Sequence, residues 1–169
     1  MKYSEQLQAA KSFIQANDHF LVVSHVQPDG DAISSTCAVG YLLDRLKKNF
    51  VMINEDSIPE KFGYLPQVEQ IQLVTKDPQH FFKHIIAVDC ADLSRMGQAE
   101  QLISPNPEIL NIDHHPTNND YGQLNLVEPS AAATAEILYD LYDQFDLAWD
   151  QDFATCIYTG ILTDTGGFR

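Results

Sequence analysis

The chain is 169 residues long, which favours a single domain whose core is large enough to need no disulfide or structural metal. Hydrophobic residues make up 44% of it and charged residues 20%, the balance of an ordinary globular protein. The formal net charge of -14 argues against a protein that follows a long nucleic-acid duplex, because such proteins need lysine and arginine to replace the counterions of the phosphates. A short phosphorylated substrate stays compatible with this charge, since bound metal ions can supply positive charge locally.

No apolar run is long enough to span a membrane, and the first residues lack the apolar stretch of a signal peptide. The three cysteines, Cys37, Cys90 and Cys156, form no CxxC pair. An odd number of cysteines without an export signal fits free thiols in a reducing compartment. We therefore expect a cytoplasmic protein without membrane contact, in which the three thiols are buried as small apolar groups.

Strand-like apolar runs alternate with amphipathic stretches along the chain, a pattern typical of an α/β fold with a parallel sheet. In chain order the pattern predicts a helix over 4–16, a strand over 20–24, a helix over 31–48, strands over 50–53, 71–74, 85–88 and 109–112, and helices over 131–142 and 152–162. We expect a mostly parallel, Rossmann-like sheet flanked by helices.

Three of the predicted strands are followed directly by aspartate or histidine. His25 follows the first strand, Asp89 the fourth, and Asp113, His114 and His115 the fifth. Ligands of an open parallel sheet bind outside the carboxyl ends of its strands. If these strands are parallel neighbours, their polar side chains converge on one crevice.

The segment after the first strand combines acidic residues with turn formers. Pro28 disfavours helical geometry at Gln27 and should keep the loop extended. Gly30 can adopt a left-handed turn, which would let Asp29 and Asp31 point toward a common centre. Asp31 also stands where a helix N-cap is expected. Taken alone, the segment fits equally well an ordinary Asp-Gly turn with a capping aspartate.

Asp164 lies near the end of the helix predicted over 152–162, before a glycine turn. An acidic residue there opposes the helix dipole, a cost that a bound cation would offset. Taken alone, Asp164 would be read as a polar residue of a C-terminal turn. Asp89 taken alone would be an ordinary strand-ending aspartate, with Asp92 free to cap the following turn.

Together these clusters supply carboxylates and imidazoles but no thiolate. That set suits Mn²⁺, with Mg²⁺, Fe²⁺ or Co²⁺ as alternatives. Two such ions about 3.5–4 Å apart could clamp a phosphoryl group for in-line attack, with Asp89 as the natural bridge between them. The sequence contains no G-x-x-x-x-G-K-[ST] loop, no G-x-G-x-x-G fingerprint and no G-x-S-x-G elbow, which argues against the site types that those motifs mark.

The clusters resemble, in order, the four motifs of DHH phosphoesterases: His25-x-x-Pro28-Asp29-Gly30-Asp31, Asp89, Asp113-His114-His115 and Asp164. The resemblance covers nearly the whole chain. Within that family the sequence is most similar to the nanoRNase (oligoribonuclease)/pAp-phosphatase group. Three segments carry this similarity: Asp113-His114-His115-Pro116-Thr117-Asn118, Ala133-Thr134-Ala135-Glu136 and Thr163-Asp164-Thr165-Gly166-Gly167-Phe168-Arg169.

The resemblance implies two Mn²⁺ ions held by acidic and imidazole side chains: His25, Asp29 and Asp89 for one ion, and Asp31, Asp89, His114 and Asp164 for the other. It implies that His115 faces the scissile phosphate and donates to a phosphoryl oxygen or to the leaving group. It also implies that Asp113 orients a histidine from behind. The implied reactions are hydrolysis of short oligoribonucleotides to mononucleotides and conversion of 3′-phosphoadenosine 5′-phosphate to AMP.

Members of this family continue with a second domain that carries a Gly-Gly-Gly-His motif and basic residues for the substrate, whereas this sequence stops at Arg169. We therefore expect residues 1–169 to be a DHH catalytic domain without its C-terminal substrate domain, with metal binding and weak or absent turnover. Alternatives in the same superfamily are a manganese-dependent inorganic pyrophosphatase and a cyclic-dinucleotide phosphodiesterase. A non-catalytic nucleotide- or metal-binding module is the alternative from another class. A homodimer is compatible with the sequence.

Overall fold

A single parallel sheet of six strands forms the centre of the computed structural model, which describes residues 1–169. The strands are β1 (Phe20–Val23), β2 (Phe50–Asn54), β3 (Ile71–Leu73), β4 (Phe82–Val88), β5 (Ile103–Asp113) and β6 (Leu124–Val127). Their order across the sheet is β3-β2-β1-β4-β5-β6, and every neighbouring pair is parallel. The predicted α/β class and parallel sheet are confirmed.

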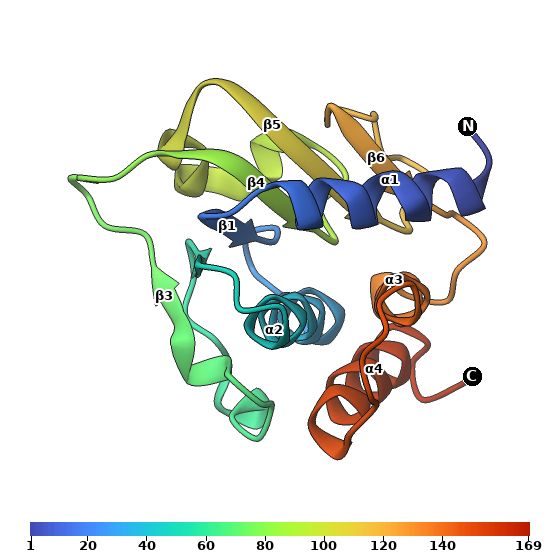
Figure 1. The fold of residues 1–169 in the computed structure, drawn as a ribbon. Helices are drawn as coiled ribbons and strands as arrows, with labels where there is room; N and C mark the ends of the chain where they lie inside the picture. The colour runs from blue at the N-terminus through green and yellow to red at the C-terminus, as the bar shows by residue number, and fades with distance from the viewer.

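The helices cover the two faces of the sheet unequally. The α-helices are α1 (Tyr3–Ala16), α2 (Gly30–Arg45), α3 (Thr134–Asp143) and α4 (Gln151–Asp164), and the 3₁₀ segments are η1 (Glu60–Phe62), η2 (Val68–Gln70) and η3 (Leu93–Leu102). The first three α-helices pack on one face, and α4 lies outside them against α2 and α3 (Figure 1). The opposite face is covered by η3.

The core explains why the central strands have continuous apolar sequences. All four residues of β1 are fully buried. Phe20 and Val22 belong to the core on the helical face, whereas Leu21 and Val23 belong to the smaller core under η3. A strand covered on both faces has no polar positions to alternate with its apolar ones.

The predicted helices and strands are all present with shifted ends, but β6 and the three 3₁₀ segments were not predicted. Helix α2 ends at Arg45 and α3 begins at Thr134, whereas the sequence pattern predicted 31–48 and 131–142. The pattern missed β6, in which Asn125 interrupts the apolar run. Asn125 lies in register with Asn111 on β5, and the Asn111 amide donates to its side-chain oxygen at 2.9 Å. A polar residue can therefore occupy this strand because a neighbouring strand supplies its hydrogen bond.

Two further expectations can be compared with the structure. The three cysteines are free and buried, as predicted. None of the helices combines the length and the apolar character needed to cross a membrane.

Candidate metal centre

The three strands that precede the acidic and histidine clusters lie side by side in the sheet. Strand β4 pairs with β1 on one side and with β5 on the other, both in parallel. Their carboxyl ends therefore meet at one edge, and they bring His25, Asp89 and Asp113 to it. The predicted convergence of these strands is confirmed.

The loop after β1 differs from its sequence-based description. Asp29, and not Asp31, is the N-cap of α2, because its Oδ1 accepts a hydrogen bond of 3.0 Å from the Ala32 amide. Asp31 lies in the first helical turn and is buried. Gly30 is helical and not left-handed. A Cβ at Gly30 would lie 2.4 Å from Oγ1 of Thr163, so the glycine permits the close approach of α4.

Residues at the end of β2 and just after it hold this loop in place. The buried Asn54 amide donates to the backbone oxygen of His25 at 3.1 Å and to Oγ of Ser24 at 2.9 Å. The Asp56 carboxylate accepts from the backbone amide of Gln27 at 2.6 Å. The left-handed residue of this loop is Gln27, whose φ is 51°, and not Gly30. Sequence reasoning missed Asn54 and Asp56, because their contacts join segments about 30 residues apart.

His25 lies between two carboxylates. Its Nε2 is 3.8 Å from Oδ1 of Asp29 and 3.6 Å from Oδ2 of Asp89, and its Nδ1 is 2.6 Å from the backbone oxygen of Val26. Burial disfavours the charged imidazolium, but the two carboxylates outweigh burial and raise the pKa of His25 to about 10. The side chain is thus placed to face a cation with Nε2, while Nδ1 faces the backbone.

His114 lies at the centre of a second group of acids. Its Nε2 is 3.2 Å from Oδ2 of Asp164, 3.8 Å from Oδ2 of Asp31 and 3.8 Å from Oδ1 of Asp89. Burial, followed by repulsion from Asp89, raises the pKa of Asp31 well above its ordinary value. Burial is also the main cause of the raised pKa of Asp164, with repulsion from neighbouring carboxylates added. This crowding of acids disfavours their charged forms unless cations are present.

The arrangement fits divalent metal ions. Oδ2 of Asp89 and Nε2 of His114 are buried and have no hydrogen-bond partner. Buried polar atoms of this kind are rare without a function, and both face other metal-capable side chains. Three groups of donor atoms lie close enough to share an ion: His25, Asp29 and Asp89; Asp31, His114 and Asp164; and Asp89, His114 and His115. All six residues predicted as ligands are therefore together, and their role as ligands stays a prediction.

His115 belongs to the third of these groups but has a nearer partner. Its Nδ1 lies 2.7 Å from Oδ1 of Asp113 and 3.5 Å from Oδ1 of Asp89. The other Asp113 oxygen, Oδ2, accepts from the Asn118 amide at 2.7 Å. The hydrogen bond with Asp113 is the main cause of the raised pKa of His115. Burial alone would raise the pKa of Asp113, yet its hydrogen bonds with His115 and Asn118 lower it. Asp113 thus occupies Nδ1 of His115 and favours the protonated ring.

The first turn of α3 donates hydrogen bonds to the two buried acids of the site. The backbone amides of Thr134 and Ala135 donate to the two oxygens of Asp31, at 2.8 and 3.1 Å. The Thr134 hydroxyl donates to Oδ1 of Asp89 at 2.9 Å. In the sequence these residues stand out only as part of the family resemblance. No local pattern predicts their contacts, because these contacts form only when α3 packs against α2 and the end of β4.

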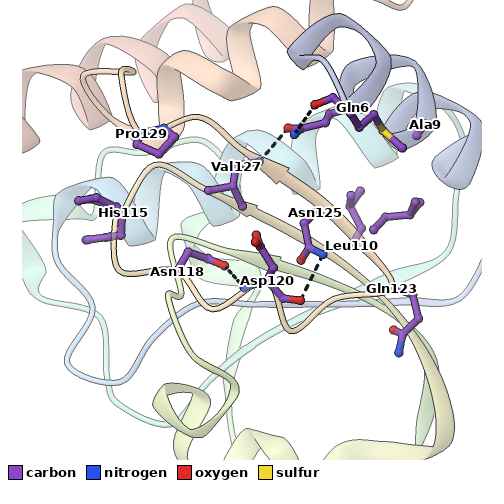
Figure 2. A pocket seen from close by; sticks show the side chains of 13 residues that line it. Gln6, Ala9, Leu110, His115, Asn118, Asp120, Gln123, Asn125, Val127 and Pro129 are labelled. Atoms are coloured by element: carbon purple, nitrogen blue, oxygen red, sulfur yellow. Dashed lines mark hydrogen bonds between the residues drawn. The ribbon is translucent and has the colours of Figure 1, made fainter.

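Two cavities border the site. One, of about 430 Å³, adjoins Asp29, Asp31 and Asp164 and is also lined by Lys61. The other, of about 520 Å³, lies between α1 and β6 and reaches His115 (Figure 2).

The second cavity offers few free polar groups. The side-chain amides of Asn118 and Asn125 line it, but both are hydrogen-bonded to neighbouring protein groups, including the backbone of Asp120. The first cavity, which combines carboxylates with a cation, is therefore the better place for a metal-bound phosphate.

The family model described as "DHH family, N-terminal domain" matches residues 19–161. The chain belongs to the DHH family. Two relatives of this DHH chain are proteins named bifunctional oligoribonuclease and PAP phosphatase NrnA. The protein from Thermus thermophilus is 35% identical over 170 residues, which cover 99% of this chain and 50% of the relative. The protein from Bacillus subtilis is 29% identical over 161 residues, which cover 92% of this chain and 49% of the relative.

A solved structure shares the fold of this chain. The exopolyphosphatase-related protein from Bacteroides fragilis superposes on this DHH chain with a TM-score of 0.86 at 25% sequence identity. The match covers 98% of this chain and 52% of that protein. The DHH chain thus spans about half the length of the curated relatives it matches.

Proposed function

We propose that the chain is the metal-binding catalytic domain of a phosphoesterase that hydrolyses short oligoribonucleotides to mononucleotides and converts 3′-phosphoadenosine 5′-phosphate to AMP. The observation that carries the proposal is the gathering of carboxylates and imidazoles around two buried atoms that have no hydrogen-bond partner, Oδ2 of Asp89 and Nε2 of His114. Membership of the DHH family supports the reaction class. Similarity to proteins named oligoribonuclease and PAP phosphatase supports the two substrates.

The proposed ligands divide into two sets that share Asp89: His25, Asp29 and Asp89 for one ion, and Asp31, Asp89, His114 and Asp164 for the other. Oxygen and imidazole donors favour Mn²⁺, with Mg²⁺, Co²⁺ or Fe²⁺ as alternatives. When bound, such a pair of ions supplies activation of water and neutralisation of phosphoryl charge. The four carboxylates of the two sets match the charge of two divalent ions, which would offset both the burial and the repulsion that raise the pKa values of Asp31 and Asp164.

His115 is the proposed proton donor. Asp113 raises its pKa and occupies Nδ1, so Nε2 is the nitrogen left to face the substrate. The imidazolium can stabilise a phosphoryl oxygen or donate its proton to the departing oxygen. Asp113 holds the ring through the hydrogen bond at Nδ1, and Asn118 in turn donates to Asp113.

The short length of the proposed substrates fits the small number of positive charges on this chain. It has 10 lysines and arginines against 24 aspartates and glutamates. Lys61 is the only basic side chain among the residues that line the cavity beside the acids, and it could pair with one non-reacting phosphate. A long polynucleotide would need a row of such contacts.

The first test combines metal binding with product analysis. Calorimetry with Mn²⁺ should give two ions per chain, and Asp89→Ala should abolish the two-ion site. The loaded chain is then incubated with RNA of two to five nucleotides, 3′-phosphoadenosine 5′-phosphate, pyrophosphate and cyclic di-AMP. We expect mononucleotides and AMP, released more slowly than by a full-length relative such as the Thermus thermophilus protein.

Other outcomes would contradict the proposal in distinct ways. Hydrolysis of pyrophosphate alone would indicate a pyrophosphatase, and cleavage of cyclic di-AMP alone would indicate a cyclic-dinucleotide phosphodiesterase. Binding without turnover, even when the chain is joined to the C-terminal half of a relative, would indicate a binding module. Absence of metal binding would remove the basis of the proposal.

A further inference from the structure

We propose that Thr134 is a positioning residue. Its hydroxyl fixes the orientation of the Asp89 carboxylate, so that one oxygen faces each of the two proposed metal sites. The inference rests on the proposed function, because it assumes that Asp89 serves both ions. Thr134 is the first residue of α3 and is fully buried. Its hydroxyl makes one hydrogen bond, of 2.9 Å, to Oδ1 of Asp89.

The two oxygens of Asp89 face different partners. Oδ1 lies 3.8 Å from Nε2 of His114, in the second ligand set. Oδ2 lies 3.6 Å from Nε2 of His25, in the first set, and has no hydrogen bond. A carboxylate with its two oxygens turned to different ligand sets would be able to offer one oxygen to each ion.

Rotation of the Asp89 carboxylate would spoil this division. The terminal torsion of an aspartate has a broad energy profile, so the carboxylate has little intrinsic preference for one orientation. Threonine is branched at Cβ and its χ1 is restricted, particularly when the side chain is buried. A donor held in this way fixes Oδ1 and leaves Oδ2 unpaired toward His25.

The same residue also anchors the other buried acid. The backbone amide of Thr134 donates to Oδ2 of Asp31 at 2.8 Å, and the amide of Ala135 donates to Oδ1 at 3.1 Å. One helical turn therefore fixes Asp31 and Asp89 relative to each other. Because the contacts to Asp31 come from the backbone, replacing the Thr134 side chain tests the contact with Asp89 alone.

Two conservative substitutions separate positioning from packing. Thr134→Val keeps the branched shape and removes the hydroxyl, whereas Thr134→Ser keeps the hydroxyl and removes a methyl group. If Thr134 only fills space, the serine variant should be the more damaged of the two. If its hydroxyl orients Asp89, the valine variant should lose metal binding and the serine variant should retain it.

The experiment measures Mn²⁺ binding by calorimetry and the spin coupling between the two ions by electron paramagnetic resonance. For Thr134→Val we expect one of the two ions to bind about 10- to 100-fold more weakly, with loss of the coupled signal. Thr134→Ser should stay close to the unmodified chain in both measurements. Thermal melts without metal check the folding of each variant. Thr134→Ala should behave like the valine variant, and it replaces that variant if the valine chain fails to fold.

Three results would overturn the inference or its premise. Unchanged affinities and an unchanged coupled signal in both Thr134→Val and Thr134→Ala would show that the hydroxyl does not position Asp89. A larger loss in the serine variant than in the valine variant would assign Thr134 a packing role. If the unmodified chain binds no Mn²⁺, it is the proposed function that fails, and this outcome is visible before any variant is compared.

Discussion

Nδ1 of His115 lies 2.7 Å from Oδ1 of Asp113, and this contact holds the histidine at the rim of the candidate metal centre. The buried carboxylate favours the charged form of the ring and raises the pKa of His115. Asp113→Asn should therefore lower the pKa of His115 toward its ordinary value of 6.5. Titration of the metal-free chain followed by nuclear magnetic resonance measures this directly.

Asp120→Asn is the matched control for that titration, because Asp120 is exposed on the same loop and its side chain makes no hydrogen bond to His115. The control should leave the pKa of His115 unchanged. An unchanged value in Asp113→Asn as well would contradict the role given to the contact. In the loaded chain, Asp113→Asn should lower kcat more than it changes KM if His115 is the proton donor proposed above.

The gathering of His25, Asp89 and His114 could be predicted because it depends on one rule with few exceptions. Apolar strands that alternate with helices form parallel sheets, and the residues that follow neighbouring strands meet at one edge. The sequence could not reveal which of Asp29 and Asp31 caps α2, since both are aspartates and aspartate suits an N-cap. The close packing of Gly30, the first residue of α2, against Thr163 is likewise a contact that the sequence does not reveal.

The contacts that orient the side chains of the site could not be predicted from the sequence, for a different reason. Thr134 contacts Asp89 across 45 residues of sequence, and Asn54 contacts His25 across 29. Neither contact leaves a periodic or compositional trace in the sequence. Strand β6 was missed because Asn125 looks like a loop residue until its partner Asn111 is known.

Asp164→Asn should stabilise the metal-free chain and weaken its response to metal. Burial and neighbouring carboxylates raise the pKa of Asp164, so its charge opposes folding at neutral pH. Removing the charge should raise Tm by about 1–2 °C in the presence of a chelator. The gain should disappear at acidic pH, where the carboxyl is already protonated. Added Mn²⁺ should then raise Tm less than in the unmodified chain, because one proposed ligand is weakened.

Differential scanning calorimetry with and without Mn²⁺ checks both halves of this expectation. Asp120→Asn again serves as a control, because it removes one acidic charge away from the cluster. A metal-free Asp164→Asn chain that is less stable than the unmodified one would show that the crowding of acids does not strain the fold.

Asp150→Ala should destabilise the helix that carries Asp164. Asp150 is the N-cap of α4, where its Oδ1 accepts from the Phe153 amide at 3.0 Å, and it also accepts from the Tyr41 hydroxyl. Loss of such a cap costs about 0.5–2 kcal/mol. Asp150→Asn keeps an acceptor for the amide and should cost less. Urea unfolding at pH 7 measures both differences.

The contribution of Asp150 to stability should depend on pH, and the direction of its pKa shift gives the sign of this dependence. The hydrogen bond from Tyr41, then the cap itself, lowers the pKa of Asp150 below its ordinary value of 3.8. A lowered pKa in the folded state means that the carboxylate stabilises the protein above the ordinary value and loses this effect as the pH falls through the folded-state value. The free energy of unfolding of the unmodified chain should therefore exceed that of Asp150→Asn by less and less between pH 5 and pH 3. A constant difference would argue against a contribution from the charge.

Gly160→Ala should separate the helices that enclose Asp31. A Cβ at Gly160 would lie 2.4 Å from Cβ of Ala135 and 2.9 Å from Oδ1 of Asp31. Alanine improves the intrinsic stability of a helix by roughly 0.5–1 kcal/mol, but overpacking a tight contact costs about 1–3 kcal/mol, so the net effect should be destabilising. Displacement of Asp31 should also weaken metal binding.

Combining Gly160→Ala with Ala135→Gly removes the nearest clash, so the double variant should be more stable than the sum of the two single changes predicts. Strict additivity in urea unfolding would mean that α4 and the start of α3 do not meet at this point.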